Sequence, residues 1–311
     1  MRITHGLHPR VAHASAVTIG NFDGLHLGHQ TMLRQLVSTA RARQLLPCAI
    51  TFEPHPREFF APDQAPARLS NLRDKLEGLR SLGIEHVHIC NFNHTLAHMS
   101  AIQFIEQILT GGLRMEYLLI GDDFRFGAQR TGDFALLQQQ STTHGYVLDA
   151  MQSVTANDLR ISSTAVRNAL AAGRFDVAQR LLGRPYHMSG RVIHGEKLGR
   201  KLGFPTANLA LKHASLPLSG IFIVQVRGLG AEPLPAVASL GIRPTVNQAE
   251  RPLLEIHLLN FNDDIYGHIL QIDFLAKLRD EEKYPNLTAL TQQIQRDVAR
   301  ARDYFNHSST A

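Results

Sequence analysis

The sequence predicts two domains: an α/β half followed by a small antiparallel β-barrel with a terminal helix. In residues 1–183, short apolar runs alternate with longer amphipathic stretches, which is typical of a parallel sheet with helices on both faces. In residues 184–311, short β-like runs follow one another without long helices until about residue 286. The length of 311 residues also suits about two domains. We therefore place the domains at 1–184 and 185–311.

The elements of the first half are expected in alternating order. Apolar runs predict strands at 16–19, 48–52, 86–90, 117–120 and 146–150, and helical spacing predicts helices at 29–43, 71–82, 100–109, 134–143, 163–171 and 175–182. Gly183-Arg184-Pro185 then breaks the pattern, because proline disfavours helix in the residue before it. Since ligands of such sheets bind at the carboxyl ends of the strands, the residues after Ile19, Phe52 and Ile120 are candidate site residues.

The second half is expected to form the barrel. Strands are predicted at 186–193, 221–227, 236–240, 253–259 and 269–275, with glycine and proline between them. A final helix is predicted at 286–305, because its apolar residues recur every three or four positions: Leu287, Leu290, Ile294 and Val298.

Composition and charge exclude several classes of protein. With 44% hydrophobic and 19% charged residues the chain is typical of globular proteins, and it contains no apolar run long enough for a transmembrane helix. The amino terminus has no apolar signal segment, and the two cysteines, Cys48 and Cys90, indicate a reducing cytoplasm. The net charge of +5 is spread over both halves without a dense basic run. We therefore expect anionic small ligands such as phosphates, with neither a nucleic-acid nor a membrane partner.

The segment 19–29, IGNFDGLHLGH, carries the densest signal for a site. It joins the first strand to the first helix, where glycines allow close approach of a ligand and free backbone N–H groups suit an anion. His26 and His29 can donate hydrogen bonds to phosphate oxygens and stabilise charge on a transferring phosphoryl group. Zinc binding or simple capping is the alternative, but no third ligand stands at the usual spacing.

This segment, Gly-Asn-Phe-Asp-Gly-x-His-x-Gly-His, resembles the nucleotidyltransferase signature of bacterial bifunctional riboflavin kinase/FAD synthetases. Its His-x-Gly-His core is shared with other nucleotidyltransferases and class I aminoacyl-tRNA synthetases. The resemblance implies a Rossmann-like nucleotidyltransferase domain that adenylylates FMN with ATP, giving FAD and pyrophosphate. It implies that His26 and His29 act on the ATP phosphates. It also implies that the rest of the loop binds the nucleotide: Gly20, Asn21, Phe22, Asp23, Gly24 and Gly28.

Three further segments of the first half extend the resemblance. Residues 51–56, TFEPHP, resemble the family's flavin-side loop. In 121–127, GDDFRFG, Asp123 would orient the nucleotide or flavin. The aromatic pair of this segment, Phe124 and Phe126, could stack on the isoalloxazine ring, with core packing as an equal alternative for either ring. In 161–167, ISSTAVR, Ser162 or Ser163 would cap a helix and Arg167 would reach phosphates; an ordinary capped helix with a surface arginine is the alternative.

The second half contains a Gly/Lys-rich stretch, 195–208, that is not a P-loop because no Gly-Lys-Ser/Thr ends it. Its end, Pro205-Thr206-Ala207-Asn208, resembles the Pro-Thr-Ala-Asn motif of riboflavin kinases. The resemblance implies that Thr206 and Asn208 hold Mg²⁺, or Mn²⁺, beside ATP, since both offer hard oxygen ligands. Gly195 and Lys201 would cradle phosphate, with a flexible basic hairpin as the alternative.

Glu255 lies inside an apolar strand, where a buried carboxylate is costly. The resemblance implies that Glu255 is the general base for the ribityl 5′-hydroxyl in the conversion of riboflavin and ATP to FMN and ADP. The alternative is an exposed strand face shared by Glu255, His257 and Leu259. Asn260 stands where the family usually has Asp, and Arg279 is expected to face the flavin or nucleotide.

The resemblance extends from about residue 18 to residue 302, with the motifs in the family's order. It implies a cytoplasmic, two-module flavin enzyme whose partners are riboflavin, FMN and ATP. Two other functions stay open: an adenylyltransferase with a different acceptor, and a non-catalytic binder on an enzyme scaffold.

Overall fold

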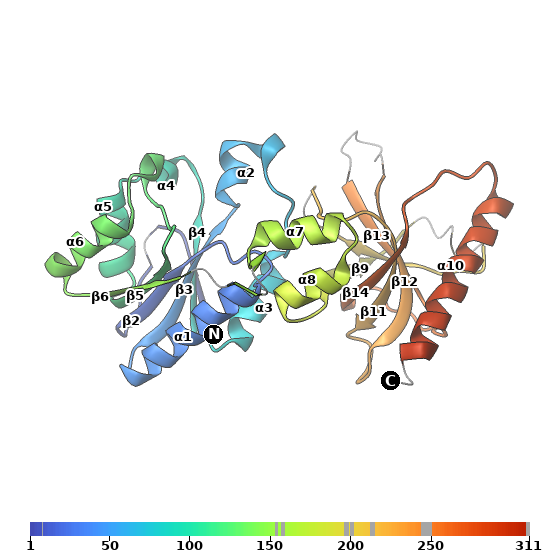
Figure 1. The fold of residues 1–311 in the computed structure, drawn as a ribbon, viewed down its shortest axis with the longest axis horizontal. Helices are drawn as coiled ribbons and strands as arrows, with labels where there is room; N and C mark the ends of the chain where they lie inside the picture. The colour runs from blue at the N-terminus through green and yellow to red at the C-terminus, as the bar shows by residue number, and fades with distance from the viewer. Residues whose placement is uncertain are drawn as a thin grey trace. The chain divides into compact units, whose positions relative to one another are not determined.

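A computed structural model describes residues 1–7, 9–152, 155–156, 159–195, 199, 202–211, 215–243 and 251–308. The chain forms two compact units (Figure 1). The first comprises Met1–Pro66 and Lys75–Ser162, and the second comprises Ala67–Asp74 and Ser163–Ala311. The predicted α/β half and the predicted barrel are both confirmed.

The first unit contains a six-stranded parallel sheet with the strand order β1-β4-β3-β2-β5-β6. Val17 in the central strand β2 lies opposite Cys48 on one side and Leu118 on the other. From β4 the chain crosses back to β5 beside β2, so the order of the strands switches between β2 and β5. The carboxyl ends at such a switch point are where ligands bind in open α/β sheets. The strands are β1 (Arg2–His5), β2 (Ser15–Ile19), β3 (Leu46–Glu53), β4 (His86–Asn91), β5 (Met115–Gly121) and β6 (Val147–Met151).

The helices of this unit follow the predicted alternation with the strands. In α1, the buried residues Leu33, Leu36, Val37 and Ala40 recur at helical spacing, and the helix contacts β2, β3 and β5. Two short helices after β3 and β4 were not predicted, because five residues are too few to show a period. The helices are α1 (Leu27–Ala42), α2 (Pro56–Phe60), α3 (Leu72–Ser81), α4 (His94–His98), α5 (Ala101–Gln103), the π-helix η2 (Phe104–Thr110) and α6 (Phe134–His144).

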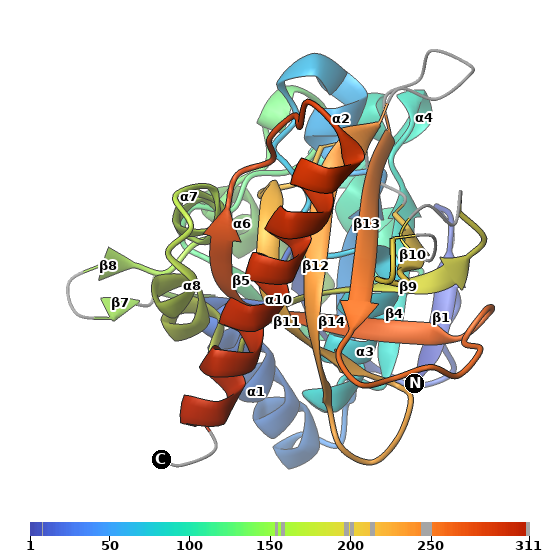
Figure 2. The same ribbon diagram turned by 90° about the vertical axis from the view of Figure 1, so that its right-hand side faces the viewer.

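The second unit contains a closed antiparallel barrel with the strand order β10-β13-β12-β11-β14-β9. Helix α10 (Leu287–Ser308) lies along the outside of the barrel, beside β12, and packs Ile294, Val298 and Ala301 against Ile223 and Val237 (Figure 2). The strands are β9 (Tyr186–Ile193), β10 (Ala207–Ala210), β11 (Gly220–Arg227), β12 (Leu234–Arg243), β13 (Arg251–Leu258) and β14 (Ile269–Arg279).

Helices α7 (Ser163–Ala171) and α8 (Phe175–Leu182) have the predicted bounds and pack against each other. Both belong to the second compact unit, where the ring of Phe175 meets Phe222 of β11 edge-on at 5.8 Å. The second compact unit therefore includes both helices, whereas the sequence places the domain boundary after them, at 184/185.

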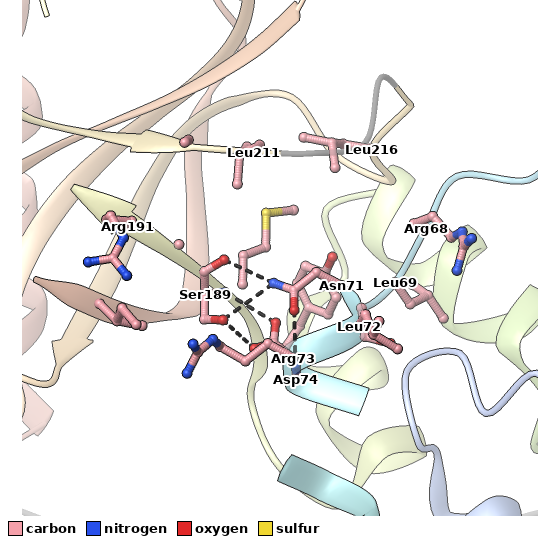
Figure 3. A pocket seen from close by; sticks show the side chains of 16 residues that line it. Arg68, Leu69, Asn71, Leu72, Arg73, Asp74, Ser189, Arg191, Leu211 and Leu216 are labelled. Carbon is pink, nitrogen blue, oxygen red and sulfur yellow. Dashed lines mark hydrogen bonds between the residues drawn. The ribbon is translucent and has the colours of Figure 1, made fainter. Parts of the chain in front are cut away.

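A strap formed by residues 67–74 also belongs to the second unit, although it interrupts the first unit in sequence. Asn71 Nδ2 donates to the carbonyl of Ser189 at 3.0 Å, and Asp74 accepts hydrogen bonds from both the backbone N–H and the hydroxyl of Ser189 (Figure 3). The strap and β9 together line a pocket of about 280 Å³. None of the site residues predicted from the sequence lines this pocket.

Candidate active sites

The first candidate site is a pocket of about 230 Å³ at the carboxyl ends of β2, β5 and β6. This is the switch point of the sheet, where the sequence predicted a ligand site. Five predicted loop residues line the pocket, and Asp123 lines it after β5. The five are Gly20, Phe22, His26, Gly28 and His29.

The loop between β2 and α1 has an unusual backbone. Phe22, Gly24 and Leu25 all have positive φ, of 48°, 81° and 45°. Left-handed φ costs energy for residues with a side chain, and such strain persists only where the surroundings enforce it, often at functional sites. The ring of Phe22 is 1% exposed and lies 3.1 Å from the position that a Cβ on Gly20 would take.

His26 and His29 form one unit at the start of α1. His26 is the N-cap, and its side chain accepts a hydrogen bond from the backbone N–H of His29. The two rings stack with their centroids 3.7 Å apart. Burial, and then the charges of His26 and Lys75, lower the pKa of His29 well below its usual value, so the ring is neutral at neutral pH. Its Nδ1 is buried and has no hydrogen-bond partner within the described part of the chain.

Three predicted loop residues do not line the pocket: Asn21, Asp23 and Gly24. The carbonyl of Asn21 accepts a hydrogen bond from Thr51 Oγ1 at 3.3 Å. Its side-chain Oδ1 is buried and unpartnered among the described residues. Asp23 is 2% exposed. Their expected roles at the nucleotide stay predictions.

The two residues expected on the β5 side have different environments. Asp123 lines the pocket and forms an exposed ion pair with Arg160 at 2.7 Å. Phe126 is 7% exposed and packs on Phe104 and Phe124, within the hydrophobic core. Phe126 thus has the core packing that was its alternative, and of the aromatic pair only Phe124 lines the pocket; stacking on a flavin stays a prediction.

The segment 161–167 divides between the two compact units. Ile161 and Ser162 line the first pocket, and Ser163 begins α7 in the second unit. Arg167 also lies in the second unit, where its Nε donates to the carbonyl of Ala67 at 2.6 Å. The roles of Ser163 and Arg167 at the nucleotide stay predictions.

The second candidate site is a pocket of about 300 Å³ in the barrel unit. Barrel strands contribute Glu255, His257 and Arg279, while α10 contributes Leu290, Ile294 and Asp297. Leu259, on the same strand face as Glu255, is 4% exposed and packs in the cluster that includes Val298 of α10. Glu255 and His257 themselves are half-buried and lie on the opposite face of β13 from the buried Leu254 and Ile256, so the partly exposed face and the catalytic role both stay predictions.

Glu255 in β13 lies opposite Asn208 of β10 and Ser239 of β12. The next residue on its face, His257, has Nδ1 2.9 Å from the carbonyl of Pro205. The Pro-Thr-Ala-Asn motif and the predicted general base are thus brought together by direct pairing of β10 and β13.

The glycines before this motif leave room for its side chains. A Cβ on Gly195 would collide with the side-chain amide of Asn208, which is 6% exposed, and a Cβ on Gly199 would lie 3.2 Å from Thr206 Oγ1. Thr206 lines the pocket, whereas Asn208 does not. Lys201 falls outside the described residues.

Two family models match the chain in tandem. The FAD synthetase model matches residues 8–165, and the riboflavin kinase model matches residues 182–305. Relatives from Escherichia coli K12, Haemophilus influenzae and Pseudomonas fluorescens, each named bifunctional riboflavin kinase/FMN adenylyltransferase, are 44%, 45% and 46% identical. The alignments cover 100%, 98% and 97% of this chain and 99%, 100% and 97% of the relatives.

The chain belongs to the bifunctional riboflavin kinase/FMN adenylyltransferase family. It is a transferase with an amino-terminal FAD synthetase module and a carboxy-terminal riboflavin kinase module, and its substrates are ATP and flavins. A crystal structure described as a macrolide-efflux protein from Streptococcus pneumoniae matches with a TM-score of 0.80 and 26% identity, over 97% of this chain and 99% of that chain. No described helix is long and apolar enough to cross a membrane.

Arg279 lines the pocket of the kinase module and is fixed by α10. Its Nη2 lies 2.8 Å from Asp297 Oδ2, and its guanidinium lies 5.7 Å from the ring centre of Tyr284. Burial opposes the charge, but the hydrogen bonds and the charge of Asp297 outweigh burial and raise the pKa of Arg279. Arg279 is therefore a fixed cation in the lining.

Asn260, where the family usually has Asp, follows β13 with a φ of 58°. Asn is among the residues that tolerate this left-handed conformation best. Its Oδ1 lies 3.5 Å from Arg302 Nη2. These contacts fit a turn-forming role.

Sequence reasoning missed several lining residues of both modules. Met32, Gln152 and Arg160 line the first pocket, and Tyr284 and Asp297 line the second. Met32 follows His29 by three positions on α1, so helical spacing alone places it on the same face. Within the described residues, no group of three His, Cys, Asp or Glu side chains is arranged to hold a metal ion.

Proposed function

We propose that the first pocket makes FAD from FMN and ATP, and that the barrel pocket makes FMN from riboflavin and ATP. Residues 1–184 would form the first catalytic module and residues 185–311 the second. One observation carries this proposal: each pocket is lined by its own candidate catalytic residues. The His26/His29 pair lines one pocket, and Glu255 lines the other.

In the first pocket, an oxygen of the FMN phosphate would attack the α-phosphorus of ATP. The new O–P bond forms as the bond to the bridging oxygen of pyrophosphate breaks. No protein nucleophile takes part, so catalysis consists of positioning and charge stabilisation. His26, His29 and the free N–H groups at the start of α1 would hold the phosphates, and the neutral ring of His29 can donate one hydrogen bond to them.

In the barrel pocket, Glu255 would accept the proton of the ribityl 5′-hydroxyl. The hydroxyl oxygen then attacks the γ-phosphorus, and the bond to ADP breaks. Glu255 is partly buried and lines the pocket together with the fixed cation of Arg279. Arg279 would hold the flavin or the phosphates in place.

Thr206 and Asn208 have the donor atoms that Mg²⁺ prefers, a hydroxyl and an amide oxygen. Gly195 and Gly199 let these two side chains pack closely against the backbone, which supports a fixed pair of metal ligands. Mg²⁺ supplies charge neutralisation of the ATP phosphates when it is bound, and Mn²⁺ accepts the same ligands.

We assign the protein to the cytoplasm. This is supported by its two free cysteines, Cys48 and Cys90, which are both buried. Burial raises the pKa of Cys90 to about 12 and also raises that of Cys48, so both thiols are inert. Riboflavin, FMN and ATP would be its partners there.

Chromatography of flavin products from two variants tests the assignment of the sites. His29→Ala should lower FAD formation from FMN by about a hundredfold or more and leave FMN formation from riboflavin unchanged. Glu255→Ala should abolish FMN formation and leave FAD formation from supplied FMN unchanged. Loss of both activities from either change would contradict two independent sites.

A further inference from the structure

Lys75 lies on the buried face of α3 and is 1% exposed. One helical turn later on the same face, Leu79 is 0% exposed. A lysine is almost never this deeply buried, because removing its charge from water is costly. An apolar side chain of equal length would fill the same space without that cost, so packing alone does not account for a lysine here.

A chain of hydrogen bonds leads from Lys75 to the phosphate-binding loop. Lys75 Nζ donates to Thr51 Oγ1 at 3.3 Å, and Thr51 Oγ1 donates to the carbonyl of Asn21 at 3.3 Å. The direction of the chain is defined, because an ammonium group can only donate. Thr51 lies in β3 and is 0% exposed, so the chain runs through the core.

These hydrogen bonds end at the loop between β2 and α1, whose backbone is strained. Asn21 directly precedes Phe22, whose φ is 48°, and strain of this kind persists only where contacts enforce it. The charge of Lys75 also acts on His29 at the other end of the loop. His26 and Lys75 are the charged or titratable groups that lower the pKa of His29, in addition to its burial.

We propose that Lys75 is a positioning residue of the adenylyltransferase site: through Thr51 it holds the carbonyl of Asn21, and it supplies a fixed positive charge close to His29. This role rests on the proposed function of the first pocket. Lys75 does not line that pocket, so it acts on the reaction through the loop and through His29.

Three variants separate this role from simple packing. Lys75→Met keeps the length and apolar stem but removes the charge and the donor. Lys75→Arg keeps both, and Leu79→Met is the matched control on the same buried face. For FAD formation, Lys75→Met should lower kcat by about ten- to a hundredfold with little change in the KM for FMN, because loop geometry controls alignment for the reaction. Lys75→Arg should recover part of this loss, and Leu79→Met should change kcat less than threefold.

The ionisation of His29 gives a second readout, which packing alone would not alter. Removing the charge of Lys75 removes one cause that lowers the pKa of His29. An NMR titration of the free protein should therefore place the pKa of His29 higher in Lys75→Met than in the wild type or in Lys75→Arg. Leu79→Met should leave it unchanged.

The experiment combines kcat and KM for FAD formation, FMN formation by the same preparation, thermal unfolding and the His29 titration. A folded Lys75→Met variant with normal FMN formation, low kcat and a raised pKa supports the proposal. An unchanged kcat overturns it, and so does an equal loss in Leu79→Met. Should Lys75→Met fail to fold, Thr51→Val must lower kcat, or the proposal fails. A wild-type protein that makes no FAD from FMN and ATP would refute the proposed function itself.

Discussion

The imidazole rings of His26 and His29 stack with their planes inclined by 16° and their centroids 3.7 Å apart. The same two residues are joined by the N-cap hydrogen bond, in which His26 Nδ1 accepts from the backbone N–H of His29 at 3.3 Å. His26 therefore begins the helix on which His29 is placed. A single substitution at His26 can affect both stability and catalysis, and two different substitutions can separate them.

The first prediction compares His26→Asn with His26→Ala. Asn is a strong N-cap residue, whereas Ala leaves the helix uncapped at a cost of about 1 kcal/mol. We expect both variants to lose FAD formation, because both lack the ring. Only His26→Ala should show a lower midpoint in chemical denaturation followed by circular dichroism. Full FAD formation in His26→Asn would mean that the ring only caps the helix.

The second prediction concerns Gly195→Ala. The added Cβ would collide with the amide of Asn208, so this side chain must move away from the position assigned to the metal ligand. We expect kcat/KM for FMN formation to fall by about tenfold or more, with a higher Mg²⁺ concentration needed for half-maximal rate. FAD formation from supplied FMN should not change.

Gly230→Ala is the control for this variant, because a Cβ there meets nothing within 4 Å. Its kinetics should match the wild type for both reactions. An unchanged Mg²⁺ requirement in Gly195→Ala would argue against Asn208 as a metal ligand.

Much of the fold follows from local patterns. Helix α8 and strand β9 have the predicted bounds, because α8 is strongly amphipathic and β9 begins directly after Pro185. Strand β10 was missed, because Ala207–Ala210 is only four residues long and shows no clear alternation. Strand β10 pairs Asn208 with Glu255. The sequence therefore predicted the Pro-Thr-Ala-Asn motif, but it did not predict the strand pairing that brings this motif beside Glu255.

Features that depend on tertiary contacts were beyond sequence reasoning. Nothing local distinguishes Phe124, which lines the pocket, from Phe126, which lies in the core. The membership of the strap 67–74 in the barrel unit depends on contacts with Ser189, more than a hundred residues away in sequence. Lys75 did leave a signal: it is a charged residue four positions before Leu79 on an amphipathic helix.

The third prediction concerns the ion pair of Arg279 with Asp297, whose side chains are 15% and 3% exposed. Asp297→Asn would remove the nearest counter-charge of the arginine and leave the more distant Glu282, and breaking a buried pair from one side costs up to about 3–5 kcal/mol. We expect a lower thermal midpoint and a higher KM for riboflavin, because Arg279 lines the pocket. The exposed Asp303→Asn on the same helix is the control and should match the wild type. A stable Asp297→Asn variant with normal KM would show that the pair is dispensable.

The fourth prediction concerns acid stability and two histidines of β4. His86 and His88 are 0% exposed, and the rings lie 2.8 and 2.9 Å from Thr4 Oγ1. Burial, followed by neighbouring positive charge, lowers the pKa of each to about 4. In the unfolded chain both have the usual pKa of 6.5. Below pH 6.5 the unfolded chain therefore binds protons that the folded protein does not, and the free energy of unfolding falls as the pH drops from 6.5 towards 4.

For His88 alone this loss amounts to about 3 kcal/mol by pH 4, since each pKa unit corresponds to about 1.4 kcal/mol. Urea denaturation of the first unit at pH 7, 6 and 5 measures the loss. We expect the free energy of unfolding of His88→Gln to fall less steeply with decreasing pH than that of the wild type. The reason is that residue 88 of the variant binds no proton in either the folded or the unfolded chain. The exposed His13→Gln is the matched control and should keep the wild-type slope. Equal slopes for His88→Gln and the wild type would mean that His88 titrates alike in the folded and unfolded protein.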